Sequence, residues 1–298
     1  MTDESYSRTD LACEAKIKDP PPIGGITAKE YTEDGITVSY MQVHSEEAAE
    51  RCGLACGQYI TLSHPKLWKL SDDAYRTFCH QLARYLRKMA ETMTGHPPDA
   101  KFSVLIAGLG NREITPDAIG PLTTDKLEVT RHLRSHAPEA FHAIGRCSLS
   151  AIAPGVLGQT GIETVELIRG AVENVRPDLV IAVDALAARS CDRLASTVQL
   201  SDRGISPGTG IGNFRQAIST ETVGVPVLAL GVPTVVDSST LVYDALAQAK
   251  IGSVSDELRR VLENGRSFFV SPKESDVITA QLSTMLAEAI SLAFTVSA

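Results

Sequence analysis

The chain has 298 residues, 43% of them hydrophobic and 21% charged, a composition typical of a globular protein whose core needs no disulfides. Its formal net charge is −8 and it has no basic stripe, which argues against direct nucleic-acid binding. The polar N-terminus has no signal-peptide run, and no segment approaches about 18 consecutive apolar residues. We therefore expect a cytoplasmic protein without membrane contact.

The N-terminal third is expected to lie outside the main body of the fold. Residues 1–34 are polar and contain three consecutive prolines, which favours an extended segment. The hydrophobic pattern that follows predicts a peripheral α+β layer over 35–98. Within it, Ser45 is expected to cap a short helix that ends at Gly53. The other elements expected in this layer are strands over 35–43 and 59–62 and a helix over 71–92.

Residues 99–298 are predicted to form an α/β body. Short apolar runs alternate here with segments of helical length, which predicts a mainly parallel central sheet with helices on both faces. The apolar runs cover 102–107, 150–153, 179–183, 198–200 and 227–230, and the helices are expected over 116–135, 161–175, 185–195 and 239–250. A loop over 203–222, an edge strand over 266–271 and a C-terminal helix over 273–295 complete the expected order.

Polar turns follow these apolar runs, and ligands of open α/β sheets bind beyond the carboxyl ends of the strands. The first turn begins Gly108-Leu109-Gly110, but Glu113 takes the place of a third glycine, so a dinucleotide site is not expected. We expect the active site at this edge of the sheet. The candidates there for binding substrate or supporting the site are Gly110, Asn111, Gln159, Thr160, Glu163, Arg189 and Asp237.

Two aspartates in these turns form a candidate catalytic pair. Asp184 is expected at the end of an apolar strand, where partial burial favours the protonated carboxyl. Asp117 is expected in the first turn of a helix, after Thr115 as N-cap, where the helix dipole favours the carboxylate. Environments that separate two pKa values in this way supply an acid and a base for peptide hydrolysis.

Other interpretations of these residues remain open. Asp117 is also a favourable first-turn acid, and Asp184 is also a suitable cap for a helix that starts at Ala185. Glu163 or Asp237 could replace either aspartate in the pair. Arg189, expected one helical turn after Asp184, suits either a substrate carboxylate or a salt bridge.

Histidine and cysteine give little support to other hydrolytic sites. All seven histidines lie at or before residue 142 and none lies in the polar turns, which disfavours a serine–histidine or cysteine–histidine hydrolase. Cys52 and Cys56 lack a second pair that would complete a zinc site, so we expect reduced thiols. We expect no cofactor, although a divalent metal between Asp117, Asp184 and another carboxylate is left as an alternative.

Several strings of the sequence closely resemble the germination protease family of spore-forming Firmicutes, from residue 8 into the C-terminal helix. They are Arg8–Glu14, Gly108–Asn111, Thr115–Asp117, Ser150–Thr164, Asp184–Ser190 and Gly231–Asp237. The resemblance implies an endopeptidase of the forespore and spore core, which degrades small acid-soluble spore proteins at germination. It also implies a homotetrameric zymogen, a fold akin to the hydrogenase-maturation proteases, and catalysis by the residues that match Asp117 and Asp184. The family mechanism has been classed as metallo and as aspartic-like, and the histidine-free turns favour the second.

The resemblance also assigns a role to the N-terminal tail. Family members cleave before a hydrophobic residue that follows an acidic one, and Asp10-Leu11-Ala12-Cys13-Glu14 resembles such a site. The family therefore implies a propeptide over 1–10, removed by self-cleavage between Asp10 and Leu11, and an extended segment over 11–34. The alternatives are a metal-assisted processing peptidase with another substrate and a non-enzymatic α/β ligand-binding module.

Overall fold

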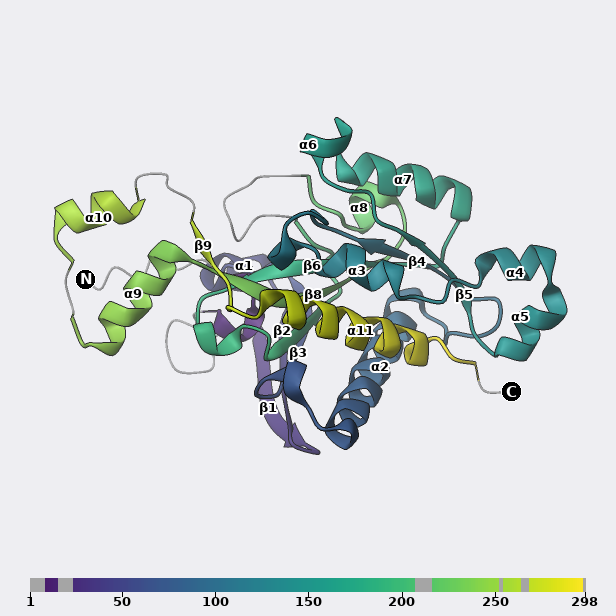
Figure 1. Ribbon diagram of the computed structural model, residues 1–298, viewed down its shortest axis with the longest axis horizontal. Helices are drawn as coiled ribbons and strands as arrows, with labels where there is room; N and C mark the ends of the chain where they lie inside the picture. Colours follow the sequence, from purple (N-terminus) through teal and green to yellow (C-terminus); the bar gives the residue numbers. More distant parts are fainter. Residues whose placement is uncertain (1–8, 16–23, 207–215, 252–253, 264–267, 297–298) are drawn as a thin grey trace.

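A computed structural model describes residues 9–15, 24–206, 216–251, 254–263 and 268–296. Within them, one mixed sheet of nine strands runs in the order β1-β2-β3-β7-β8-β6-β4-β5, and β9 pairs with β8 (Figure 1). The strands are β1 (Ile26–Glu33), β2 (Ile36–Val43), β3 (Gly57–Ser63), β4 (Ser103–Gly108), β5 (Ser148–Ile152), β6 (Leu179–Ala188), β7 (Thr197–Ser201), β8 (Val227–Asp237) and β9 (Phe269–Val270).

Only part of this sheet is parallel, so the expectation of a mainly parallel sheet was wrong. The strands β5, β4, β6 and β8 pair in parallel, whereas β1, β2, β3, β7 and β9 join by antiparallel pairing. One cause is the short connection between β6 and β7, which spans only 189–196. A parallel crossover needs about a dozen residues or more, so β7 returns antiparallel to β8 and presents its other edge to β3.

The N-terminal elements form where the sequence predicts them, and their strands extend the sheet. Helix α1 (Glu46–Cys52) begins at Ser45, whose Oγ accepts a hydrogen bond from the Ala48 amide, and ends at Gly53 with φ 72°. Helix α2 (Asp72–Thr94) follows β3. Residues 26–33, expected within an extended segment, instead form the edge strand β1. Most of its side chains are exposed, so it lacks the buried alternation that indicates a strand.

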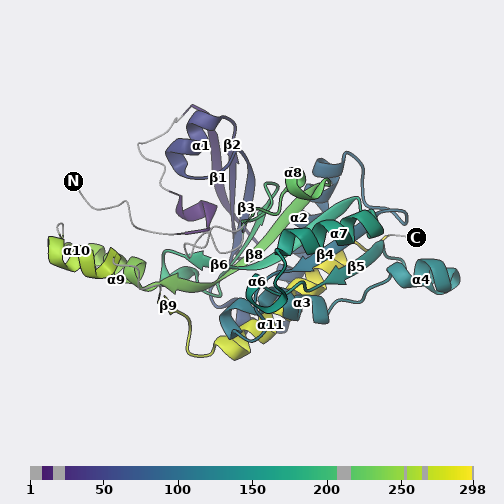
Figure 2. The same cartoon turned by 90° about the horizontal axis from the view of Figure 1, so that it is seen from above.

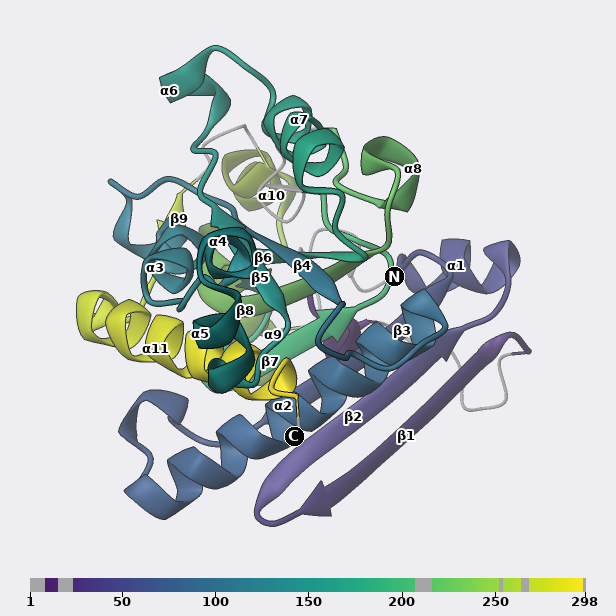
Figure 3. The same ribbon diagram turned by 90° about the vertical axis from the view of Figure 1, so that its right-hand side faces the viewer.

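Helices cover both faces of the sheet (Figure 3). One face packs on α2, α3 (Ile119–Asp125) and α11 (Ser275–Ala293), and this layer holds the largest apolar core. The opposite face packs on α7 (Thr164–Val175) and the short α8 (Thr220–Val223). Figures 1 and 2 show α9 (Ser238–Gln248) and α10 (Asp256–Glu263) at one end of the molecule, and α4 (Arg131–His136) at the other.

Two expected helices differ from the structure. The segment over 116–135 is divided into the 3-10 turn η4 (Thr115–Asp117), α3 and α4, and α5 (Pro138–Ile144) follows. The helix expected over 185–195 is absent, because β6 continues to Ala188 and a 3-10 turn η5 (Cys191–Arg193) comes next. In the expected loop over 203–222, Ile205 bridges to Ile218, and residues 207–215 lie outside the described residues.

The C-terminal segments agree with their predicted positions. Strand β9 lies within 266–271 and α11 within 273–295, while α9 matches the helix expected over 239–250. Helix α10 was not predicted. None of the helices in the described ranges is both long enough and apolar enough to cross a membrane.

Candidate active site

Asp184 lies inside β6, and not at the end of a strand. It is paired in register with Gly231 of β8, which is paired in turn with Gln199 of β7. Residues opposite each other in neighbouring strands point to the same face, so Asp184 and Gln199 share a face with only a glycine between them. Asp184 is 5% exposed, and its Oδ1 accepts a hydrogen bond from the Ala185 amide at 2.9 Å.

The interpretation of Asp184 as the cap of a helix starting at Ala185 was therefore wrong. Residues 185–188 pair with β8 and continue the strand. Alternation along β6 places Asp184 on the same face as Leu186 and Ala188, which belong to a small apolar cluster around Leu11. The face that carries Asp184 is thus the face on which the N-terminal tail lies.

Asp117 is brought back toward the sheet by the turn that follows β4. The Leu109 amide donates to the Val183 carbonyl at 2.8 Å, and the chain then turns at Gly110, with φ 109°. Asp117 lies in η4, which packs against β6 and β8, and its Oδ2 accepts from the Asn111 amide at 2.6 Å. Thr115 is the first residue of η4 and does not cap it, since the N-cap position belongs to Ile114.

Asn111 and Gln159 extend this contact into a short hydrogen-bonded chain. Gln159, exposed on α6 (Leu157–Thr160), donates from Nε2 to Asn111 Oδ1 at 2.9 Å. The structure thus brings together three of the candidate residues: Gln159, Asn111 and Asp117. Thr160 bonds within its own turn, where its hydroxyl donates to the Val156 and Ile162 carbonyls.

The remaining candidates lie at the ends of β8, α7 and β6. Asp237 is buried at the end of β8, where its Oδ1 accepts from the Thr240 amide at 3.0 Å and caps α9. It follows Gly231 by six residues in β8, about 20 Å along a strand. Glu163 is the N-cap residue of α7. Arg189 follows β6 directly, so its predicted helical spacing from Asp184 does not exist.

The segment Thr9–Glu14, called the tail below, is docked on the end of β6. The Asp10 amide donates to the Ala187 carbonyl at 2.9 Å, and Asp10 Oδ2 accepts from the Ala187 amide at 2.8 Å. The Leu11 side chain is fully buried in the cluster with Leu186, Ala188 and Val236. The peptide bond predicted to be cut is therefore held against the strand that carries Asp184.

Glu14 and Gln199 complete the contacts of the tail. The Glu14 carboxylate is buried and accepts from the amides of Arg189 at 2.7 Å and Ser190 at 2.9 Å. Gln199 forms two hydrogen bonds to the tail backbone. Its Nε2 donates to the Asp10 carbonyl at 2.8 Å, and its Oε1 accepts from the Ala12 amide at 2.7 Å.

Two cavities flank the docked tail. One, of about 250 Å³, is lined by Asp10, Asp184 and Gln199 among others, and Asp117 is not among its described lining residues. Tyr59 also lines it, and burial raises the pKa of the Tyr59 phenol to about 12, with Asp202 acting in the same direction. The second cavity, of about 770 Å³, lies past the other end of the segment. Its lining includes Cys13, Glu14, Trp68, Arg189 and Arg193.

Sequence reasoning missed Gln199, although the sequence of β7 holds a signal. Thr197, Gln199 and Ser201 occupy every second position of this strand, yet all three are buried. A polar face on a strand is usually exposed, and here the tail covers Gln199. The backbone amides of Ala187, Arg189 and Ser190 carry no sequence signal at all, because every residue except proline has one.

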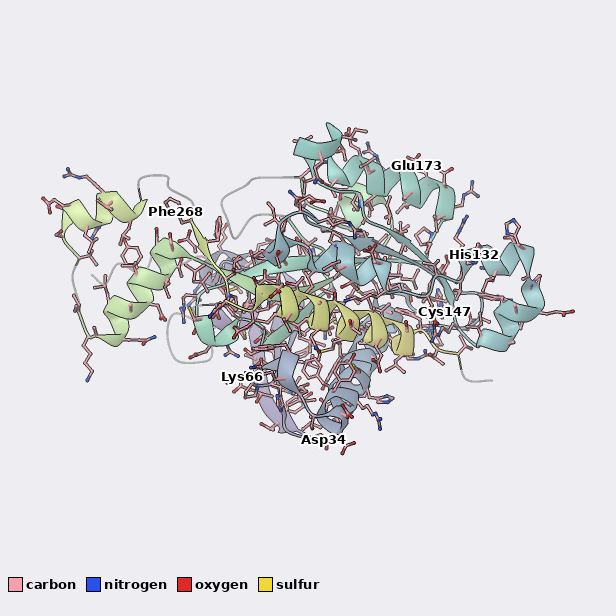
Figure 4. All side chains as sticks on the ribbon, viewed as in Figure 1. Asp34, Lys66, His132, Cys147, Glu173 and Phe268 are labelled. Carbon is pink, nitrogen blue, oxygen red and sulfur yellow. The ribbon has the colours of Figure 1, made fainter. Side chains whose placement is uncertain are left out.

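One histidine, His64, lines the larger cavity beside the docked tail. Figure 4 labels His132, which lies on α4 at the opposite end of the molecule from Phe268 beside β9. In the described part of the chain, no group of three or more His, Cys, Asp and Glu residues is arranged to hold a metal ion.

Comparison with known proteins identifies the family. Residues 8–261 match the germination protease family. The chain is 37% identical to the germination protease of Caldanaerobacter subterraneus subsp. tengcongensis, over 96% of this chain and 93% of that protein. It is 37% identical to one from Clostridium perfringens, over 96% and 94%, and 43% identical to that of Priestia megaterium, over 80% and 66%. The chain therefore belongs to the germination protease family and is an endopeptidase.

Proposed function

We propose that this endopeptidase cuts its own precursor between Asp10 and Leu11 and then begins the breakdown of small acid-soluble spore proteins, with Asp117 and Asp184 as its catalytic pair. One observation carries the proposal. The docked tail holds the Asp10–Leu11 bond on the face of β6 that carries Asp184, and Asp10 and Asp184 line one cavity. The family membership does not favour a non-enzymatic ligand-binding module.

The proposed chemistry is hydrolysis by an acid and a base. One carboxylate takes a proton from water, and the water oxygen attacks the carbonyl carbon of Asp10. The other carboxyl donates a proton, the C–N bond breaks, and Leu11 leaves with a new amino group. Asp117 does not line the cavity, so its place in the pair rests on the family resemblance and is tested directly by Asp117→Asn.

The contacts of the tail indicate what an external substrate needs. The Asp10 side chain accepts a hydrogen bond from the Ala187 amide, and Leu11 packs in an apolar pocket. Glu14 accepts from the amides of Arg189 and Ser190. A segment with an acid, then an apolar residue, then an acid three residues later satisfies the same groups. The family implies small acid-soluble spore proteins as the source of such segments.

The test is self-cleavage of the full-length chain, followed by mass spectrometry across a series from mildly acidic to neutral pH. Wild type is expected to lose residues 1–10. Asp184→Asn and Asp117→Asn are each expected to slow this loss by about 10²–10⁴-fold, the range for removal of a general acid or base. Asp192→Asn, a matched change at an exposed carboxylate near the tail, should cut at the wild-type rate. Wild-type cutting by Asp184→Asn would reject the pair.

The alternative chemistry uses a divalent metal held by Asp117, Asp184 and another carboxylate. Prolonged treatment of the full-length chain with a strong chelator separates the two mechanisms. Cleavage that continues after this treatment supports the aspartic-like pair. Cleavage that stops, and returns when a divalent metal is added, supports the metal.

The family also implies a fold like that of the hydrogenase-maturation proteases, and this remains a prediction. We further propose that the protein forms a homotetramer in the spore core, as the family implies. The end of the molecule near α10 and β9 supports an assembly. It exposes Val261, which is 68% accessible, and Phe268, which is 61% accessible. Sedimentation of the wild type should give four times the monomer mass, and Val261→Asp with Phe268→Asp should reduce it.

A further inference from the structure

We propose that Gln199 acts on the reaction itself, as the donor that stabilises the negative charge on the carbonyl oxygen of the bond being cut. This rests on the proposed cut between Asp10 and Leu11, since the carbonyl of that bond is the Asp10 carbonyl. Gln199 Nε2 donates to this oxygen at 2.8 Å in the docked tail.

The two contacts of Gln199 determine the orientation of its side-chain amide. The Ala12 amide can only donate, so the atom that faces it at 2.7 Å must be the oxygen Oε1. The Asp10 carbonyl can only accept, so the atom facing it must be the nitrogen. If the side-chain amide were flipped, its nitrogen would face the Ala12 amide, donor against donor. Its oxygen would face the Asp10 carbonyl, acceptor against acceptor. The donor therefore points at the carbonyl before any reaction begins.

The position of Gln199 also suits a charge-stabilising donor. It is 7% exposed, on the strand two away from the one that carries Asp184, and Gly231 lies between them in register. Neighbouring strands are about 4.8 Å apart, so the two backbones are about 10 Å apart. Asp184 and Gln199 can thus act on one peptide bond from two sides. Burial also strengthens the hydrogen bond, because little water screens it.

The water oxygen forms a bond to the Asp10 carbonyl carbon, its proton passes to a carboxylate, and the carbonyl π electrons move to the oxygen. Gln199 keeps its protons and donates a hydrogen bond to this oxyanion, which is a stronger acceptor than the original carbonyl. The electron pair then returns, the bond to the Leu11 nitrogen breaks, and that nitrogen takes a proton from the protonated carboxyl of the pair. The contact is strengthened during the reaction, so it raises the rate.

The test compares variants of the full-length chain by their rate of self-cleavage. Gln199→Glu keeps the shape and an acceptor for the Ala12 amide, but it places a carboxylate oxygen against the Asp10 carbonyl. We expect self-cleavage to slow by about 10²–10³-fold at neutral pH, the loss seen when one oxyanion donor is removed. The defect should shrink as the pH falls, relative to wild type at each pH, because the protonated carboxyl can donate again.

Two further variants keep the result interpretable. Gln81→Glu makes the same change at a glutamine of α2 that is 6% exposed and does not contact the tail, and it should cut like wild type. If Gln199→Glu does not fold, Gln199→Met replaces it. Self-cleavage of Gln199→Met should be slow at every pH, because methionine cannot donate a hydrogen bond. Thermal unfolding followed by circular dichroism checks that each variant is folded.

The results separate this role from simple positioning and from the proposed function. Alkylation of Cys13 reports whether the tail is docked, since its side chain is half-buried in the docked tail and burial raises the pKa of its thiol. Slow cleavage with wild-type alkylation supports the donor role, and slow cleavage with an undocked tail overturns it. If Asp184→Asn stops the cut while the folded Gln199 variants cut within about twofold of wild type, the donor role fails and the proposed function stands. If wild type never cuts after Asp10, both fail.

Discussion

At the scale of single residues, the candidate site depends on backbone groups as much as on side chains. Asp117 accepts from the Asn111 amide and Asp184 from the Ala185 amide. Such bonds hold a carboxylate in one orientation at little entropic cost, because the backbone is already ordered. The Asn111 amide faces Asp117 only because the chain turns sharply at Gly110. A side chain at this glycine would therefore collide with the backbone of Asp117.

Gly110→Ala is expected to disrupt the turn. A Cβ there would lie 2.0 Å from the Asp117 carbonyl oxygen, and φ is 109°, a conformation that alanine rarely adopts. We expect a loss of about 1–3 kcal/mol or more in the free energy of unfolding, measured by urea denaturation, and at least tenfold slower cleavage. Gly170→Ala, in α7 with nothing near its Cβ position, should keep full activity.

At the scale of elements, the largest difference from the sequence prediction is the length of β6, which continues to Ala188 where a helix was expected. Ala185-Leu186-Ala187-Ala188 consists of strong helix formers, so local propensity favours the helix that the sequence predicts. Pairing with β8 and packing against Leu11 outweigh that propensity. The continued strand leaves the Ala187 backbone open to Asp10, and the amides just beyond it open to Glu14. The docking site for the tail therefore exists because residues 185–188 form a strand and not the predicted helix.

The same contacts imply that the tail competes with external substrate. After a cut at Asp10, residues 11–14 would still fill the apolar pocket and the contacts of Glu14. Glu14→Gln weakens the docking, because a neutral amide is a poorer acceptor for the amides of Arg189 and Ser190. We expect slower self-cleavage and faster cleavage of an added acidic–apolar–acidic peptide. A change of both rates in the same direction would contradict this competition.

Cys13 offers a direct measure of this undocking. Burial raises the pKa of its thiol, with Glu14 acting the same way and Arg193 in opposition. The reactive thiolate therefore forms at higher pH than on a free cysteine, and alkylation of the docked tail is slow near neutral pH. Glu14→Gln should shift the pH dependence of alkylation at Cys13 downward, measured by peptide mass spectrometry. Cys191, exposed in η5, serves as the internal control.

At the scale of the whole molecule, β7 joins the N-terminal strands to the parallel part of the sheet. Leu200 is fully buried and pairs with Ile60 of β3 on one side and Leu230 of β8 on the other. The expected peripheral layer over 35–98 thus continues the sheet through its strands. This continuity predicts that both parts unfold together.

Leu200→Ala tests that cooperativity. The buried truncation is expected to cost about 2–5 kcal/mol of unfolding free energy. Trp68, the one tryptophan of the chain, lies in the N-terminal part, so its fluorescence and far-UV circular dichroism should give one coincident urea transition in wild type and variant. Leu258→Ala, on the exposed side of α10, should cost less than about 0.5 kcal/mol. Two separate transitions would show residues 35–98 to be an independent domain.

The sequence by itself determined the features that depend on neighbouring residues. Ser45 and Gly53 bound α1 because capping and a left-handed turn act within a few residues, and the apolar runs locate the buried strands. The family, and with it the two aspartates to test, also follows from the order of motifs along the chain. The tertiary structure alone decided the mixed sheet, the length of β6 and the place of Gln199 beside Asp10. These three features depend on pairing between segments far apart in the chain, and on which backbone amides remain unpaired by neighbouring strands. No local sequence pattern therefore encodes them.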